Sequence, residues 1–124
     1  MILFLAEDNE DNYLVVKSNL RKVKEPVELV WARDGVEAVE KLETMERVDL
    51  FMVDISMPRM DGLELTRWIK GQERFARTPV VAITASVFAD MKKRYLDEGM
   101  DRILEKPFSR QEFLRMLEET GGVR

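Results

Sequence analysis

The sequence contains no cysteine and no histidine. Without cysteine there is no disulfide framework and no thiol chemistry. Without histidine there are no Ser–His or Cys–His catalytic pairs, and no metal site that depends on imidazole. A functional site in this chain must therefore be built from carboxylates, hydroxyls, amides and amines.

Long apolar stretches are missing as well. No run approaches the roughly 20 residues that a membrane helix needs, and Ile2–Ala6 is too short for a signal-peptide core and has no basic leader. The net charge of −4 gives no basic stripe for nucleic acid. We therefore expect a cytoplasmic protein with no membrane insertion and no direct nucleic acid binding. Its 124 residues, 45% of them hydrophobic, fit one domain over residues 1–124.

Three continuous apolar runs predict buried strands. They are Ile2–Ala6, Leu50–Val53 and Val80–Ile83, each short and bounded by polar or turn residues. Such runs suit strands of a parallel sheet that helices cover on both faces. Two more mixed segments, Val27–Ala32 and Arg102–Glu105, suit strands nearer the sheet edges.

Helical patterns alternate with these runs. The expected helices cover Asn12–Lys24, Gly35–Met45, Asp61–Lys70, Phe88–Glu98 and the segment after Ser109. Asp61 and Ser109 each precede a glutamate by three residues, which is the signature of a capping box. The alternation predicts an α/β fold with a doubly wound, five-stranded parallel sheet of the flavodoxin-like type and five helices. The strand order 2-1-3-4-5 places the most apolar strands in the middle.

Acidic side chains follow two of the predicted central strands. The first strand ends in Glu7 and Asp8 and the third in Asp54, so three carboxylates should meet at the edge where open parallel sheets bind ligands. Like charges this close repel one another, and a hard divalent cation such as Mg²⁺ relieves the repulsion. Taken alone, the stretch Glu7–Asp11 is better explained as a solvated acidic loop. The independent arrival of Asp54 at the same edge favours a metal site.

A hydroxyl and an amine lie at two further strand ends. Thr84 ends the fourth predicted strand and Lys106 follows the fifth. Taken singly, a helix-capping threonine and a surface lysine are the plainer interpretations. Together with the three acids they form a set suited to phosphoryl transfer. A metal and Lys106 can neutralise the oxygens of a phosphoryl group on Asp54, and the Thr84 hydroxyl can bond one of them.

The stretches that carry these residues resemble the receiver domain of response regulators in two-component signalling. They are LAEDNEDN (5–12), MVDISMPRMDGLEL (52–65), PVVAITA (79–85) and ILEKPFS (103–109), so the resemblance covers essentially the whole chain. The resemblance implies that Asp54 is the phosphoacceptor. It also implies that Thr84 is the switch hydroxyl and that Lys106 pairs with the phosphate.

The same resemblance implies a bound Mg²⁺ ion. Its ligands would be Asp8 directly, Glu7 through water, Asp54, and the backbone carbonyl of Ser56. The resemblance also implies a cis peptide bond between Lys106 and Pro107.

A few positions matter for how such a switch works. Glu7 stands where the family more often has Asp, and Ile103 stands where it usually has an aromatic residue. In the family, this aromatic residue usually moves together with the switch threonine. Ile103 can still swap between two packing positions, but it has no ring or hydroxyl with which to follow that motion. Ser56 and Ser86 occupy positions at which the family tunes dephosphorylation.

The favoured function is a stand-alone response regulator that is a signalling protein rather than an enzyme. A sensor histidine kinase or a histidine phosphotransfer protein would supply the phosphoryl group, and the phosphorylated form would change protein partners or relay the phosphate. Met1 directly before the first strand suggests a natural start, and no output domain is expected. Val87–Arg94 and exposed residues near Arg102 are candidates for the partner surface, with an ordinary solvated helix face as the alternative.

Two other functions stay open. A Mg²⁺-dependent phosphatase or phosphotransferase for small molecules also uses a strand-end aspartate. It usually needs a second carboxylate two residues further on, where this sequence has Ser56. A non-phosphorylated scaffold is the other alternative, although a scaffold has no reason to keep repulsive charges together. Turnover of a phosphate ester would support the first, and absence of Mg²⁺ binding the second.

Overall fold

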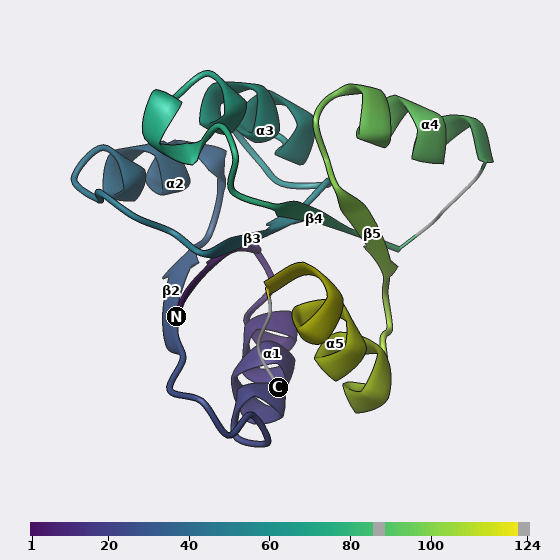
Figure 1. Ribbon diagram of the computed structural model, residues 1–124. Coiled ribbons are helices and arrows are strands. Elements are labelled where there is room, and N and C mark those ends of the chain that lie inside the picture. The colour runs from purple at the N-terminus through teal and green to yellow at the C-terminus, as the bar shows by residue number, and fades with distance from the viewer. Residues whose placement is uncertain (86–88, 122–124) are drawn as a thin grey trace.

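The computed structural model describes residues 1–85 and 89–121, and within them five strands alternate with five helices (Figure 1). The strands are β1 Ile2–Ala6, β2 Glu28–Ala32, β3 Leu50–Asp54, β4 Val80–Thr84 and β5 Arg102–Glu105. The helices are α1 Glu10–Leu20, α2 Gly35–Leu42, α3 Gly62–Lys70, α4 Ala89–Asp97 and α5 Arg110–Met116. Two short helical turns follow α3 and α5, namely η1 Glu73–Phe75 and η2 Leu117–Gly121.

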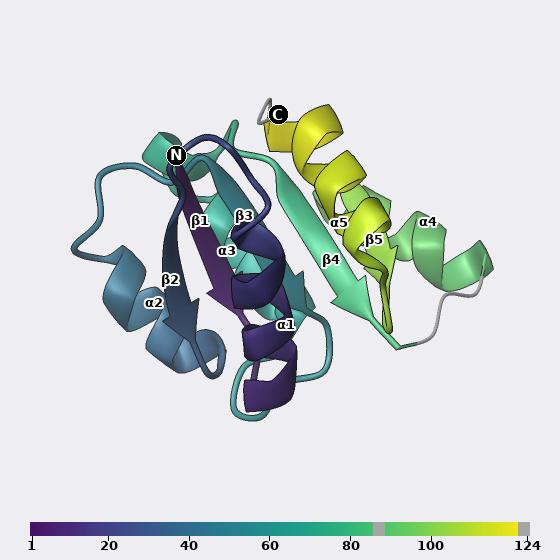
Figure 2. The same ribbon diagram turned by 90° about the horizontal axis from the view of Figure 1, so that it is seen from below.

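The strands form one parallel sheet in the order β2-β1-β3-β4-β5, which confirms the predicted fold (Figure 2). Strands β3 and β4 are buried along their whole length, whereas the edge strands β2 and β5 contain exposed positions. Both β3 and β4 extend one residue beyond their predicted apolar runs. The reason is that Asp54 and Thr84 still pair with the neighbouring strands, opposite Ile83 and Glu105.

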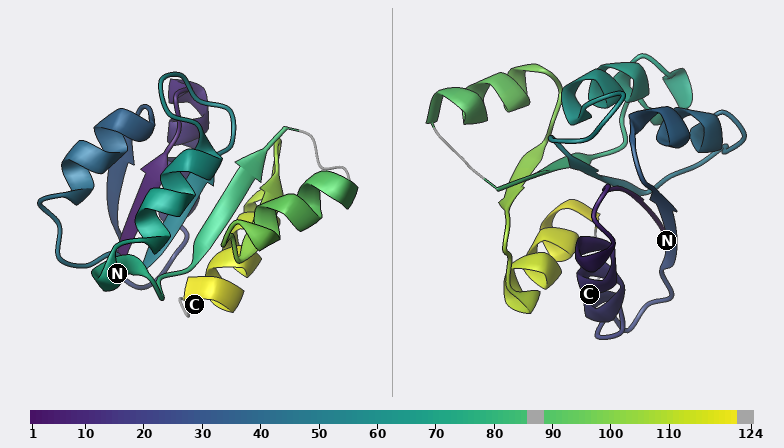
Figure 3. Two further views of the ribbon diagram at one scale, coloured as in Figure 1. Left: turned by 90° about the horizontal axis from the view of Figure 1, so that it is seen from above. Right: turned by 180° about the vertical axis from the view of Figure 1, so that it is seen from behind.

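Helices cover both faces of the sheet (Figures 1 and 3). Helices α1 and α5 lie on one face, over a core that includes Leu3 and Leu5 of β1. Helices α2, α3 and α4 lie on the other, over a core that includes Phe4 and Ala6 of the same strand. This alternation follows from the two-residue period of a strand. No helix within the described ranges is long and apolar enough to span a bilayer.

Capping residues determine where the helices begin. The predicted capping boxes of α3 and α5, at Asp61 and Ser109, are both present. Helix α1 begins at Glu10, two residues earlier than predicted, because the Asn9 side chain accepts a hydrogen bond from the Asn12 amide and caps the helix there.

The first two helices end earlier than predicted. Helix α1 stops at Leu20 rather than Lys24, and α2 stops at Leu42 rather than Met45. In both cases the chain continues in turns with three-residue hydrogen bonds instead of the helical four-residue ones. After α2, Arg74 of η1 donates hydrogen bonds to the carbonyl oxygens of Leu42 and Met45. The predicted start of the fourth helix, at residue 88, lies outside the described residues.

Candidate functional site

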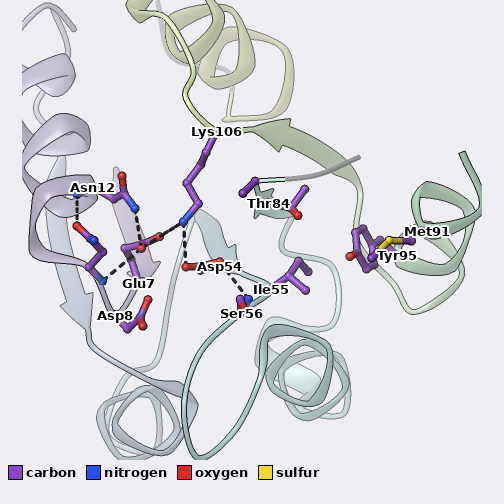
Figure 4. A pocket seen from close by; sticks show the side chains of 12 residues that line it. Glu7, Asp8, Asn12, Asp54, Ile55, Ser56, Thr84, Met91, Tyr95 and Lys106 are labelled. Carbon is purple, nitrogen blue, oxygen red and sulfur yellow. Dashed lines mark hydrogen bonds and ion pairs between the residues drawn. The ribbon is translucent and has the colours of Figure 1, made fainter. Parts of the chain in front are cut away.

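The acidic residues of the predicted site meet at the carboxyl edge of the sheet (Figure 4). Glu7 and Asp8 follow β1, and Asp54 ends the adjacent strand β3. One carboxylate oxygen of each lies within 4.8 Å of the others. Glu7 and Asp54 are buried, with 1% and 3% of their surface exposed, whereas Asp8 is exposed. Two buried carboxylates and one solvated carboxylate therefore share one small region.

Lys106 reaches into this acidic group from the loop after β5. Its Nζ lies 3.1 Å from Oδ2 of Asp54 and 3.4 Å from each carboxylate oxygen of Glu7. The Lys106 side chain is half-buried, with 18% of its surface exposed. The peptide bond between Lys106 and Pro107 is cis, as the resemblance implied. Lys106 thus supplies a single positive charge to two buried acids at once.

One ammonium does not balance the negative charge of this group. Burial raises the pKa of Glu7 from 4.5 to about 7; the Asn12 hydrogen bond opposes this rise and the nearby Asp54 charge adds to it. Burial would lower the pKa of Lys106, but the hydrogen bond and charge of Asp54, followed by those of Glu7, outweigh it and raise that pKa. Lys106 is therefore fully charged at neutral pH, and Glu7 is partly protonated there in the metal-free site.

The first turn of α1 holds the Glu7 side chain. Its Oε1 accepts hydrogen bonds from the Asn12 side chain at 3.0 Å and from the Asn9 amide at 3.3 Å. Sequence reasoning missed both asparagines. Asn9 before two acidic residues was a readable helix-capping signal. The contact from Asn12 depends on how the helix begins and had no such signal.

An aromatic pair supports the backbone of the same loop. The indole N–H of Trp31 on β2 donates to the carbonyl oxygen of Glu7 at 2.8 Å. The Trp31 ring stacks on Tyr13 of α1, with ring centres 4.0 Å apart and an angle of 8° between the planes. This pair fixes the acidic loop between the edge strand and α1. Nothing in the sequence pattern distinguished Trp31 from any other edge-strand residue.

Ser56 and Thr84 lie on the far side of Asp54 from Glu7 (Figure 4). The amide of Ser56 donates to Oδ1 of Asp54 at 3.1 Å, so the loop after β3 orients the carboxylate. Thr84 ends β4, is 7% exposed, and lines the same cavity as the three acids, Ser56 and Lys106. All the residues predicted for the site are thus brought together. Ser86, predicted to tune dephosphorylation, lies outside the described residues.

Glycine at position 62 allows α3 to start directly against the phosphoacceptor candidate. A Cβ atom there would lie 2.4 Å from the backbone oxygen of Asp54 and 2.8 Å from the Cα of Ile55. The Gly62 amide closes the loop by donating to the carbonyl oxygen of Ile55 at 3.0 Å. Any larger residue would push α3 away from the end of β3.

The acidic group opens into a cavity of about 430 Å³. Its polar wall contains the residues described above, and its apolar end is formed by Ile55, Met91 and Tyr95. Met91 and Tyr95 lie four residues apart on α4, and Tyr95 is almost fully buried. That spacing puts both side chains on one face of the helix. Sequence reasoning did not use this spacing, although it could have indicated the apolar end of the cavity. Ile103 does not line this cavity.

Ile103 instead lies in a second depression, on the side of α4, β5 and α5. Lys92, Arg102 and Arg115 line the same depression together with Glu105 and Glu112, so side chains of both charges surround it. The predicted partner surface Val87–Arg94 is only partly within the described residues, and Lys92 and Arg102 are the members that face this depression. Its role as a partner surface stays a prediction.

The donor set of the acidic group fits a hard divalent cation. Carboxylate oxygens within 4.8 Å of one another match ligands around one small ion, and Mg²⁺ commonly takes one or two carboxylates together with waters and phosphate oxygens. The exposed position of Asp8 leaves the ion a path from solvent. The excess of negative charge over the single Lys106 ammonium gives such an ion an electrostatic reason to bind.

Comparison with known proteins identifies the family. The family model of the response regulator receiver domain matches residues 3–118. Over 128 residues the chain is 40% identical to histidine protein kinase 1 of Candida albicans; the match covers 96% of this chain, which spans only 5% of that kinase. Over 120 residues it is 29% identical to the polar-differentiation response regulator DivK of Brucella anthropi, and the match covers 97% of this chain and 95% of DivK.

A solved structure agrees with these sequence matches. The receiver domain of sensor histidine kinase PA1611 from Pseudomonas aeruginosa PAO1, which has a magnesium ion coordinated in its active site cleft, is 33% identical to this chain. The two superpose with a TM-score of 0.85, covering 98% of this chain and 97% of the other. The chain therefore belongs to the receiver domain family of response regulators in two-component signalling.

Proposed function

We propose that Asp54 accepts a phosphoryl group from the phosphohistidine of a sensor histidine kinase or a histidine phosphotransfer protein, with Mg²⁺ as cofactor. One observation carries this proposal. Lys106 contacts the buried Asp54 carboxylate at 3.1 Å within a group of three acids at the carboxyl edge of the sheet. A strand-end carboxylate beside a fixed cation and further acids has the parts that phosphoryl transfer requires.

The transfer would form one bond and break one. A carboxylate oxygen of Asp54 attacks the phosphorus, the P–N bond of phosphohistidine breaks, and the imidazole nitrogen keeps the electron pair of that bond. The hydrogen bonds of Asp54 orient it before the donor arrives, because Oδ1 accepts from the Ser56 amide and Oδ2 faces Lys106. Such orientation lowers the entropy that must be lost when the donor and acceptor meet.

The neighbouring residues would bind the oxygens of the transferred phosphoryl group and neutralise their negative charge. Lys106 would shift its ammonium from the Asp54 carboxylate to a phosphoryl oxygen, and Thr84 would donate its hydroxyl to another. Asp8, Asp54 and the carbonyl of Ser56 would hold Mg²⁺, with Glu7 contacting it through water. The bound ion would supply further positive charge to the phosphoryl oxygens.

The output of such a protein is a change of state rather than turnover of an external substrate. A phosphoryl group acts as a switch when one of two conformations holds its charge better. We propose that residues 1–124 work as a stand-alone receiver in the cytoplasm and either change protein partners or relay the phosphate. DivK, which the match covers to 95% of its length, is an example of a response regulator of about this extent.

A phosphorylation assay tests the proposal. The protein is incubated with Mg²⁺ and a small phosphodonor such as acetyl phosphate, and intact-mass spectrometry then follows the phosphorylated species. We expect one phosphate on the wild type, and none on Asp54→Asn or after chelation of Mg²⁺. Asp61→Asn is the matched control, because Asp61 lies in the same loop and asparagine also caps a helix. Equal phosphorylation of Asp54→Asn and the wild type would contradict the proposal.

A further inference from the structure

The β3–α3 loop, residues 55–61, connects Asp54 to α3 and contains Ser56, the predicted carbonyl ligand of the metal. The ends of the loop are joined to each other by the hydrogen bond from the Gly62 amide to the Ile55 carbonyl. Between these ends the loop packs against the start of α2, where Gly35 lies directly against Met60. The Ser56 amide is already bound to Oδ1 of Asp54, so the remaining support for the Ser56 carbonyl must come from what holds the middle of the loop.

Arg59 holds the middle of this loop to the rest of the molecule. Its Nε and Nη2 atoms both donate to Oδ2 of Asp34, at 3.0 and 2.7 Å. Asp34 lies between β2 and α2, and its side chain is 12% exposed against 58% for Arg59. Two donors from one planar guanidinium fix the direction of the contact as well as its length.

The backbone of Arg59 has a conformation that is unfavourable for a long side chain. Its φ of 67° lies in the left-handed region, where glycine or asparagine is favoured and a long side chain is not. Among the described non-glycine residues it is the one with a positive φ. A loop that needed only this turn would accept glycine. The contact with Asp34 offsets the unfavourable backbone conformation of an arginine.

Asp34 is a fixed partner rather than a mobile one. Its Oδ1 caps α2 by accepting a hydrogen bond from the Glu37 amide at 2.8 Å. The next residue, Gly35, packs directly on the loop: a Cβ atom there would lie 2.6 Å from both the Cβ and the carbonyl oxygen of Met60. The start of α2 is thus a rigid support against which the β3–α3 loop rests.

We propose that Arg59 is a positioning residue for the metal site, holding the Ser56 carbonyl in place through its ion pair with Asp34. The inference rests on the proposed function, because it takes a divalent cation to bind at Asp8, Asp54 and Ser56. Arg59 is not among the residues that would hold the ion or the phosphoryl group. It acts through the loop, as residues behind metal ligands commonly do. Linkage then requires the bound metal to strengthen the contact between Arg59 and Asp34 in return.

Two substitutions separate this ion pair from the backbone around it. Arg59→Asn removes the guanidinium, yet asparagine tolerates the left-handed backbone. Asp34→Asn keeps an oxygen to cap α2 but removes the charged acceptor of Arg59. The matched control is Arg47→Asn, because Arg47 donates to Asp49 at 3.1 Å at the opposite end of β3. The control loses an exposed ion pair without touching the β3–α3 loop.

Calorimetric titration with Mg²⁺ alone gives the first measurement. We expect Arg59→Asn and Asp34→Asn each to weaken Mg²⁺ binding by about threefold to tenfold. The double variant should be no weaker than the weaker single variant, because both remove the same contact. Arg47→Asn should bind Mg²⁺ like the wild type. Wild-type affinity in Arg59→Asn, or equal weakening in Arg47→Asn, would overturn the inference.

Hydrogen exchange without metal gives the second measurement. The Gly62 amide, which closes the loop, should exchange faster in Arg59→Asn than in the wild type. Faster exchange with unchanged Mg²⁺ affinity would mean that Arg59 orders the loop without positioning a ligand, and would overturn the inference. Failure of the proposed function looks different, because wild-type binding of Mg²⁺ would then be absent or independent of Asp54.

Discussion

The protonation of Glu7 should make Mg²⁺ binding depend on pH in a range where most carboxylates do not titrate. Glu7 is 1% exposed, and its burial raises its pKa to about 7, above the usual 4.5. A cation bound among Glu7, Asp8 and Asp54 favours the ionised form of Glu7. The proton must therefore leave as the metal binds, and metal affinity should rise with pH.

The size of the effect follows from this pKa. With a pKa of about 7, Glu7 is about nine-tenths ionised at pH 8 and about one-tenth ionised at pH 6. If binding requires the ionised form, the apparent dissociation constant for Mg²⁺ should rise about tenfold from pH 8 to pH 6. Glu7→Gln keeps the size and hydrogen-bonding shape of the side chain but has no proton to lose. Its affinity should be weaker at pH 8 and nearly constant over this range.

Titration calorimetry in buffers of different ionisation enthalpy measures both the affinity and the number of protons released. At pH 6 we expect about nine-tenths of a proton released for each Mg²⁺ bound to the wild type, and almost none for Glu7→Gln. Asp61→Asn serves as a control for loss of an acid outside the site. A wild-type affinity that is flat between pH 6 and pH 8 would refute the reasoning. So would an equal pH dependence in Glu7→Gln.

Three further predictions concern the supports of the site. Lys106→Met removes the cation from two buried acids and should lower the free energy of unfolding by about 3 kcal/mol. Chemical denaturation measures this loss, and adding Mg²⁺ should restore part of it. Gly62→Ala forces a Cβ to within 2.4 Å of the Asp54 backbone oxygen; thermal unfolding should reveal a loss of about 2 kcal/mol. Trp31 donates to the backbone of the acidic loop, so its fluorescence in a Trp68→Phe background should respond to Mg²⁺; no response would contradict that coupling.

The same pKa shift has a consequence for folding in the absence of metal. The pKa of Glu7 is higher in the folded protein than in the unfolded chain, so the folded state favours its protonated form. The contribution of Glu7 to stability is therefore fully present below about pH 4.5 and is lost as the pH rises through about 7. The loss is of the order of 3 kcal/mol for this single group. The difference in unfolding free energy between the wild type and Glu7→Gln isolates it from the other titrating groups.

The strands and their ends were predictable because burial on both faces leaves a simple pattern. Continuous apolar runs identified β1, β3 and β4, and the parallel arrangement placed the polar residues after them at one edge. That geometry alone was enough to bring Glu7, Asp8 and Asp54 together. The capping boxes of α3 and α5 were predictable for a similar reason, since each depends on residues three apart in the chain.

The contacts that tune the site were not predictable in the same way. Asn12 on Glu7 and Arg59 on Asp34 join side chains whose meeting depends on loop paths and helix starts. Neither has a fixed sequence spacing or a burial pattern. The start of α1 was wrong for a different reason, because the Asn9 cap, which the sequence could have indicated, outweighed the apolar periodicity used to place the first turn.

The chemistry of Glu7 depends both on its place in the sequence and on its surroundings in the folded protein. The sequence placed an acid after β1, but the same residue in a solvated loop would have an ordinary pKa. Burial, the charge of Asp54 and the single Lys106 ammonium shared between both acids change its chemistry. A glutamate, one methylene longer than aspartate, reaches Lys106 and Asn12 together from this strand end. Its protonation state therefore reports the charge balance of the whole site, and a bound cation or a phosphoryl group must each shift it.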